Sequence, residues 1–141
     1  MTLPTDALKR KYIPLARGCL DYFPAALARV ASLSAKGNQQ HHPDKEIHWD
    51  RSKSSDHADA LVRHFLERGT VDIDGVRHSA KVAWRALALL QEELEREEGL
   101  PAPRNATALP HWHKDWGKPS HPMSAETLRD EYEKSDGETG V

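Results

Sequence analysis

The stretch from residue 75 to residue 98 carries the clearest helical pattern in this chain and does most to limit its fold. Its apolar residues recur at steps of four, three, four, three and four, which places them along one side of an α-helix. They are Val76, Ala80, Ala83, Leu87, Leu90 and Leu94. Asp74 is expected to cap this helix, and Gly99 is expected to end it. The pattern therefore predicts a long amphipathic helix around which the rest of the chain packs.

Two shorter segments show the same helical spacing. One helix is predicted over Tyr22–Lys36, with Gly37 at its exit. Another is predicted over Ser55–Arg68, with Ser54 or Ser55 as its cap. No segment shows the alternating pattern that is typical of a strand. The predicted fold class is therefore all-α, in the form of a small helical bundle.

Composition limits the possible functions and points to burial between subunits. The 141 residues carry a net charge of −2, which argues against stable nucleic-acid binding, and only 38 % are hydrophobic. A chain this polar has a modest core, so shared helices in an oligomer are expected. The single cysteine, Cys19, excludes an intrachain disulfide and a thiolate metal cluster. Because no apolar run approaches the ~20 residues that cross a bilayer, a cytoplasmic protein that binds no membrane is expected.

The composition changes after residue 98. The segment that follows is rich in proline and holds Trp112 and Trp116, with one more short helix predicted over Ser124–Lys134. We therefore expect a helical domain over residues 1–98 and an irregular C-terminal tail over residues 99–141.

Two carboxylates lie one turn apart at the start of the second predicted helix. Helical geometry places Asp56, Asp59 and Arg63 on one side of that helix. Mg²⁺ is often held by one or two carboxylates together with water and substrate phosphates, so Asp56 and Asp59 are candidate metal ligands. The alternative is an ordinary solvated acidic face in which Arg63 pairs with Asp59.

A row of polar side chains runs along the long helix, away from its apolar stripe. It consists of His78, Lys81, Arg85 and Glu92. Lysine and arginine neutralise phosphate oxygens, so Lys81 and Arg85 are candidate substrate-binding and catalytic residues. The alternative is an ordinary polar face with Lys81 and Arg85 one turn apart. The occurrence of both polar faces on neighbouring helices favours polyphosphate chemistry.

Residues 37–54 show no periodicity and are expected to form a long loop. Amide side chains such as Asn38 and Gln39 can pair with purine edges, and Trp49 can stack on a base. The alternative is that Trp49 packs in the core and the amides cap helices. Histidines also cluster in this loop and near residue 112, but they lack the spacing of a metalloprotease zinc site.

Four stretches of the chain resemble a known family. They are DYFPAALARVA, GNQQHHP, IHWDRSKSSDHADALVRHFLERG and RHSAKVAWRALALLQEELE. In their order and spacing they resemble the phage dATP/dGTP diphosphohydrolase N-terminal-domain family, which is related to MazG-like all-α nucleotide pyrophosphohydrolases and to the similar MazZ enzymes. The resemblance covers about Lys9–Glu98.

The resemblance implies an enzyme that hydrolyses a purine deoxynucleoside triphosphate to the monophosphate and pyrophosphate. It also implies Mg²⁺ or Mn²⁺ as cofactor, a MazG-like bundle assembled as a homodimer or dimer of dimers, and a location in the host cytoplasm if the gene belongs to a phage. The alternative is a non-catalytic helical nucleotide-binding or interaction protein with a degenerate metal site.

The resemblance further suggests which residues act. Relatives carry an E-x-x-E helix followed by an E-x-x-D helix, and Asp56-x-x-Asp59 matches the first of these with shorter side chains. At the place of the second motif the chain has His78-x-x-Lys81, so either Lys81 and Arg85 replace a cation with fixed positive charge or other residues supply the missing ligands. The candidates for these are Glu46, Asp50, Asp72, Asp74 and Glu92. The predicted catalytic residues are Asp56, Asp59, His78, Lys81 and Arg85, and the predicted substrate-binding residues are Asn38, Gln39, Trp49, Lys53, Arg63, Lys81 and Arg85.

Overall fold

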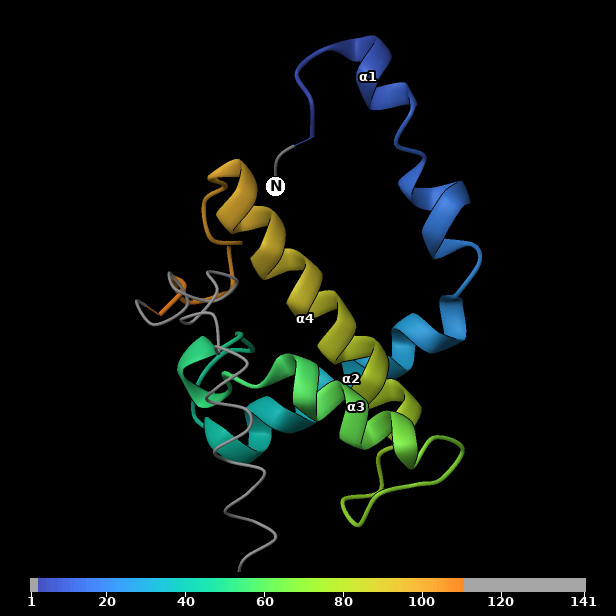
Figure 1. Ribbon diagram of the computed structural model, residues 1–141, viewed down its shortest axis with the longest axis vertical. Helices are drawn as coiled ribbons and strands as arrows, with labels where there is room; N and C mark the ends of the chain where they lie inside the picture. Colours follow the sequence, from blue (N-terminus) through green and yellow to red (C-terminus); the bar gives the residue numbers. More distant parts are fainter. Residues whose placement is uncertain (1–2, 111–141) are drawn as a thin grey trace, which may run out of the picture. The chain divides into compact units, whose positions relative to one another are not determined.

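The regular structure of the chain is helical (Figure 1). The computed structural model describes residues 3–110. In chain order the elements are α1 (Ala7–Lys11), the π-helix η1 (Ala16–Leu20), α2 (Pro24–His41), the 3₁₀ helix η2 (Arg51–Lys53), α3 (His57–Leu66) and α4 (His78–Glu98). Within residues 3–110 there is no strand, and β-pairing is confined to the isolated bridges Trp49–Ala106 and Val71–Arg77. The all-α prediction is confirmed.

Helix α4 is the element on which both α2 and α3 pack (Figure 1). It ends as predicted, at Gly99, whose φ of 64° lies in the left-handed region that suits glycine. Its start differs, because α4 begins at His78 and Arg77 stands at the N-cap position. The prediction that Asp74 caps α4 was therefore wrong. Asp74 lies in a turn that Gly75 makes with a φ of 77°, and its carboxylate accepts a hydrogen bond from Val76 N at 2.9 Å.

The boundaries of α2 and α3 also differ from the predicted ones. Helix α2 continues through Gly37 to His41, so Asn38 and Gln39 are helical and do not belong to a loop. It stops where His42 precedes Pro43, a position that disfavours helical backbone. Asp56 stands at the N-cap position of α3, in place of the predicted Ser54 or Ser55, and its side chain makes no capping hydrogen bond.

The contact between α3 and α4 buries polar side chains. Buried apolar residues within the described part of the chain are small, namely Ala60 and Ala88. The buried polar residues are Arg51, His57, His78, Glu92 and Glu95. Arg51 makes a bidentate ion pair with Glu95, with nitrogen–oxygen distances of 2.7 and 2.8 Å. The polar row predicted on the long helix is therefore the face of α4 that turns toward α3.

The apolar faces of the same two helices are exposed in the single chain. On α4, Leu87 and Leu90 each retain 52 % of their accessible surface. On α3, Val62, Phe65 and Leu66 are exposed as well. Within one chain, the apolar stripe that predicted the long helix is thus only partly covered.

A segment after α4 returns to the residues before α3. Trp49 N donates to Asn105 O at 2.7 Å, and Thr107 N donates to Trp49 O at 3.0 Å. The Thr107 hydroxyl accepts a hydrogen bond from Arg51 N at 3.0 Å. The segment 99–110 therefore holds Trp49 and Arg51 in place from outside the helices.

No described helix is both long and apolar enough to cross a membrane. The predicted helix over Ser124–Lys134 and the two tryptophans Trp112 and Trp116 lie outside the described residues.

Candidate functional site

The end of α3 and the start of α4 bring two histidines and an aspartate together. His64 lies in the last turn of α3, His78 is the first residue of α4, and Asp72 lies in the connection between them. The Nδ1 atoms of the two imidazoles are 3.0 Å apart. One ligand atom from each of the three residues lies within 4.8 Å of the others, which is a spacing that suits a metal ion.

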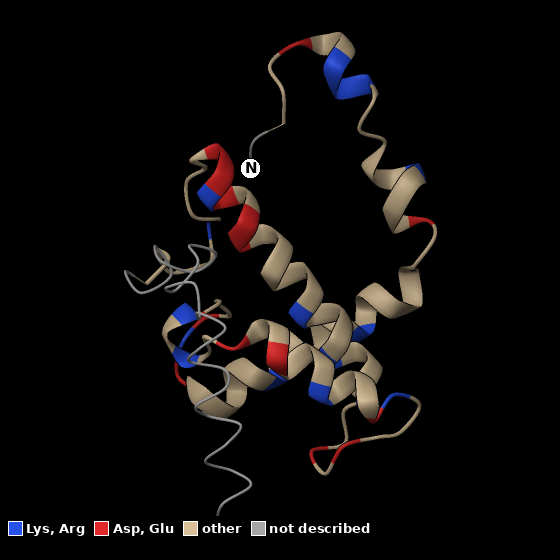
Figure 2. Ribbon diagram, in the orientation of Figure 1, with Lys and Arg blue, Asp and Glu red and all other residues tan. Residues whose placement is uncertain are grey.

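Lys81 lies beside this group and is held by two carboxylates. Its Nζ atom is 2.6 Å from Asp72 Oδ2 and 2.7 Å from Asp74 Oδ2. The hydrogen bond from Lys81 lowers the pKa of Asp72 and also that of Asp74. Burial opposes the charge on Lys81, but the two carboxylates outweigh burial and raise its pKa. Figure 2 shows acidic residues in this connection, and the carboxylates of Asp72 and Asp74 favour the charged form of Lys81.

Arg85, one turn further along α4, reaches a buried histidine. Its Nη1 atom donates to the Ser54 hydroxyl and lies 3.0 Å from His57 Nδ1. Because guanidinium groups only donate, His57 Nδ1 accepts, and the ring proton belongs on Nε2. That atom is 3.4 Å from Glu92 Oε1. Burial lowers the pKa of Arg85, which means that its charge lies in a poorly solvated place.

The predicted carboxylate pair is divided between two environments. Asp56 is half-buried and pairs with Arg63 at 2.5 Å, and that hydrogen bond lowers the pKa of Asp56. Asp59 is exposed in the first turn of α3. Among residues 3–110, neither Asp56 nor Asp59 belongs to a group of three side chains spaced to hold one metal ion. Their role as a metal-binding pair stays a prediction.

The other predicted residues are placed as follows. Asn38 hydrogen-bonds to the backbone of residues 42–48, Gln39 is exposed on α2, and Lys53 is exposed on η2. The Trp49 ring packs edge-on against Trp84, with ring centroids 5.6 Å apart. This is the kind of contact expected from the alternative in which Trp49 packs in the core. Base stacking by Trp49 and base pairing by the amides stay predictions.

The additional metal-ligand candidates also separate. Asp72 lies close enough to His64 and His78 for the three to hold one metal ion. Asp50 lies in a second such group, with His42 and His48. Asp74 pairs with Lys81 but belongs to neither group. Glu92 faces His57 inside the α3–α4 contact, and the backbone oxygen of Glu46 contacts His48.

Sequence reasoning missed His64, although a signal was present. His64 follows His57 by seven residues on α3, and His78, Arg85 and Glu92 follow each other at the same interval on α4. A seven-residue repeat keeps side chains on one side of a helix, so both sets face the same contact. The histidines of α3 could have been paired with this row from the sequence.

One protein family matches the chain. The model of the family described as dATP/dGTP diphosphohydrolase, N-terminal, matches residues 6–100, which is more than half of the 141 residues. The match includes the α3–α4 face, which consists of the side chains of His64, Asp72, His78, Lys81 and Arg85. No curated protein and no solved structure matches the chain. By this match, the chain belongs to the dATP/dGTP diphosphohydrolase N-terminal family.

Proposed function

We propose that the α3–α4 face hydrolyses dATP or dGTP to the monophosphate and pyrophosphate, with attack of water on the α-phosphorus. The observation that carries this proposal is that Lys81 contacts Asp72 of the His64–Asp72–His78 group, while Arg85 contacts His57 and is close enough for its charge to act on His64. Fixed cations stabilise the charge of departing phosphates, and nitrogen and oxygen donors bind a divalent ion. The family description supports purine deoxynucleotides as substrates.

The donor set fits a divalent ion and favours Mn²⁺ over Mg²⁺. Mg²⁺ prefers oxygen ligands, whereas two of the three donors here are imidazole nitrogens, which suit transition metals. Such an ion, when bound, supplies polarisation of phosphate oxygens and lowers the pKa of its water. His64, Asp72 and His78 would hold it, and Asp56 and Asp59 remain the predicted carboxylate pair near the start of α3.

The cations would then act on the triphosphate. Arg85 is poorly solvated and can exchange its contact with Ser54 for a phosphate oxygen. Arg63 is exposed and can swing from Asp56 toward the same substrate. Lys81 keeps its place between two carboxylates, so its charge is fixed close to His78. His57 orients Arg85 from inside the helix contact.

The test is an assay of each dNTP with Mn²⁺ or Mg²⁺, with the products identified as monophosphate and pyrophosphate. Asp72→Asn should lower turnover of dATP or dGTP by at least roughly 10- to 100-fold. Loss of a residue that only hydrogen-bonds to a metal ligand already costs that much, and Asp72 is a proposed ligand. Asp59→Asn tests the predicted carboxylate pair in the same assay, and Asp44→Asn, an exposed loop position, is the control. No turnover of any nucleotide by the unaltered protein would reject the hydrolase and favour a nucleotide-binding protein.

We also propose that the chain assembles as a homodimer or dimer of dimers of MazG-like type. The exposed apolar residues of α3 and α4 support this, because exposed apolar surface on neighbouring helices is typical of an interface. Light scattering of the purified protein measures the assembly directly. A monomer at micromolar concentration would contradict it.

A further inference from the structure

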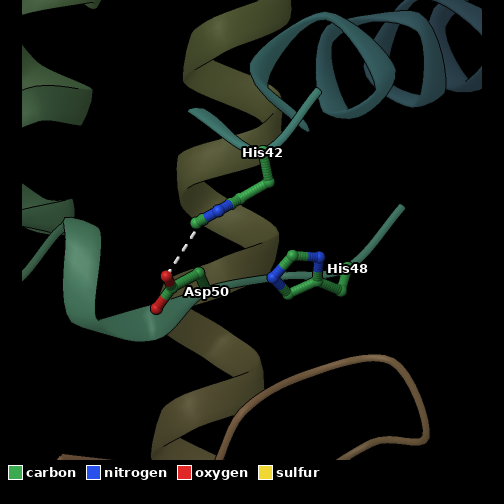
Figure 3. A group of neighbouring side chains, drawn as sticks. All are labelled: His42, His48 and Asp50. Carbon is green, nitrogen blue, oxygen red and sulfur yellow. Dashed lines mark hydrogen bonds and ion pairs between the residues drawn. The ribbon is translucent and has the colours of Figure 1, made fainter. Parts of the chain in front are cut away.

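A second group of possible metal ligands lies between α2 and η2. It consists of His42, the C-cap residue of α2, together with His48 and Asp50. One ligand atom from each lies within 4.8 Å of the others. In Figure 3 both imidazoles point toward the carboxylate of Asp50, and a dashed line joins His42 to that carboxylate. All three residues are half-buried, so the group is shielded but open to solvent.

His48 and Asp50 each have one side-chain atom engaged by the surrounding protein and another directed at the group. His48 Nδ1 lies 2.9 Å from the Glu46 carbonyl oxygen, which can only accept, so the ring proton belongs on Nδ1. This leaves the lone pair of His48 on Nε2. Histidines that bind metals usually carry such a hydrogen bond on the other ring nitrogen, because it fixes the tautomer and the ring orientation.

Asp50 shows the same division between its two oxygens. Oδ1 accepts hydrogen bonds from Ser52 N at 3.0 Å and from the Ser52 hydroxyl at 2.6 Å. Oδ2 lies 3.1 Å from His42 Nε2. The carboxylate is therefore held by one oxygen and presents the other to the imidazoles.

The loop that carries the group is fixed by Asn38. The Asn38 amide nitrogen donates to Lys45 O at 3.0 Å and to His42 O at 3.3 Å, and its oxygen accepts from His48 N at 3.3 Å. One side chain thus ties both ends of the segment 42–48. A site built in this way needs little rearrangement to bind an ion.

We propose that His42, His48 and Asp50 bind a divalent transition-metal ion of the zinc type. Two imidazole nitrogens and one carboxylate oxygen match zinc and disfavour Mg²⁺ and Ca²⁺, which prefer oxygen ligands. Three protein ligands leave a fourth position for water. The ion would join the end of α2 to the residues that lead into Trp49 and Arg51. This site is separate in its residues from the proposed hydrolase site, so the two can fail independently.

The proposal is tested with Co²⁺, whose visible absorption reports nitrogen and oxygen ligands, and with Zn²⁺ as competitor. The full chain is freed of metal with a chelator and titrated, next to His48→Gln and the control His41→Gln. His41 is adjacent to His42 but exposed and outside the group. We expect His48→Gln to bind one equivalent of Co²⁺ fewer than the unaltered chain, or to bind one equivalent with an affinity lowered by more than about 10- to 100-fold. His41→Gln should bind Co²⁺ as the unaltered chain does.

The difference between His48→Gln and His41→Gln isolates this site, because each variant lacks one histidine and all remaining histidines are the same. Equal stoichiometry and affinity in the unaltered chain and His48→Gln would overturn the proposal. Equal loss in His48→Gln and His41→Gln would also overturn it, since binding would then depend on histidine number and not on geometry.

A second measurement avoids any loss of folding in the variants. Histidine ring nitrogens of the unaltered, ¹⁵N-labelled protein are followed by NMR during a Zn²⁺ titration. We expect His48 to keep its proton on Nδ1 and to show the large shift of a metal-bound nitrogen at Nε2. No shift in the rings of His42 and His48 at saturating Zn²⁺ would overturn the proposal.

Discussion

The two long faces of α4 differ in a way that reverses the usual arrangement of a small protein. The face toward α3 buries charged and imidazole side chains, including Glu92 and Glu95, while the opposite face leaves Leu87 and Leu90 half exposed. Burial of charges is costly unless they are paired, so such a contact adds little to stability by itself. The two proposals above rest on this difference: the polar face is the proposed hydrolase site, and the apolar face is the proposed interface between chains.

The largest expected effect tests the polar face. Glu95→Ala would leave Arg51 buried without its carboxylate, and both side chains are at most 2 % exposed. Removal of one partner of a buried pair costs about 3–5 kcal/mol in the free energy of unfolding. Urea denaturation at a fixed protein concentration measures this cost.

The control for that variant is Arg63→Ala. It breaks the ion pair between Arg63 and Asp56, in which the Arg63 side chain is 62 % exposed and the Asp56 side chain is 44 % exposed. An exposed pair contributes less than about 1 kcal/mol. Similar losses in Glu95→Ala and Arg63→Ala would show that the buried pair has no special part in stability.

The next effect tests the apolar face. Replacement of Leu87 and Leu90 by aspartate should dissociate the assembly, because each half-exposed leucine would lose about 1–2 kcal/mol of burial at an interface. Light scattering should then give the mass of one chain. Leu8→Asp, at an exposed position of α1, is the control. If the double variant keeps the mass of the unaltered protein, this face does not form the interface.

A smaller effect concerns the contact between α2 and α4. The indole nitrogen of Trp84 donates to the Ser34 hydroxyl at 2.9 Å in a half-buried place. Ser34→Ala should cost about 1 kcal/mol in the free energy of unfolding, because the indole N–H loses its partner. Ser32→Ala makes the same change at an exposed position of the same helix and should be neutral. Equal effects would mean that the hydrogen bond is not formed in solution.

The smallest expected effect is a gradual loss of stability in acid. Burial, together with the nearby charge of Lys81, lowers the pKa of His64 below its ordinary 6.5, so the unfolded chain binds more protons than the folded one. This contribution is complete above pH 6.5 and is lost as the pH falls through the lowered pKa. The melting temperature, followed from pH 7.5 to 5.5, should therefore decline.

His64→Gln should flatten that decline, since glutamine does not titrate. A further decline should begin below the ordinary pKa of 4.5 of glutamate, and His64→Gln should keep it. Burial opposes the ionisation of Glu95, but hydrogen bonds from Arg51 and Gln91 outweigh burial and lower its pKa. A melting temperature independent of pH between 7.5 and 5.5 in the unaltered chain would contradict the His64 argument.

The sequence predicted helices well and their contacts poorly, for a physical reason. The spacing of apolar residues and end signals such as Gly99 depend only on neighbours in the chain. They predicted the start of α4 to within three residues. Which face of a helix is covered depends on distant partners. The apolar stripe and the polar row of α4 were both predicted, but the pattern did not say which of them is buried within one chain. The buried ion pair of Arg51 with Glu95 shows that the polar face is inside.

The candidate site was predicted in part. His78, Lys81 and Arg85 were selected because cations at helical spacing suit phosphates, and the structure brings them to one face with Asp72. His64 was missed. Its seven-residue spacing from His57 could have placed it on the side of α3 that faces α4, but its approach to Asp72 depends on the turn at Gly75, which local patterns do not show.

The pairing of residue 49 with residues 105–107 has a consequence for shortening the protein. A polypeptide that ends at residue 98 or 100 would keep all of α4, but it would lack the carbonyl of Asn105 and the hydroxyl of Thr107. The amides of Trp49 and Arg51 would then lose their acceptors, directly beside the buried guanidinium. The shortest fragment that retains the folded state should therefore extend beyond Thr107.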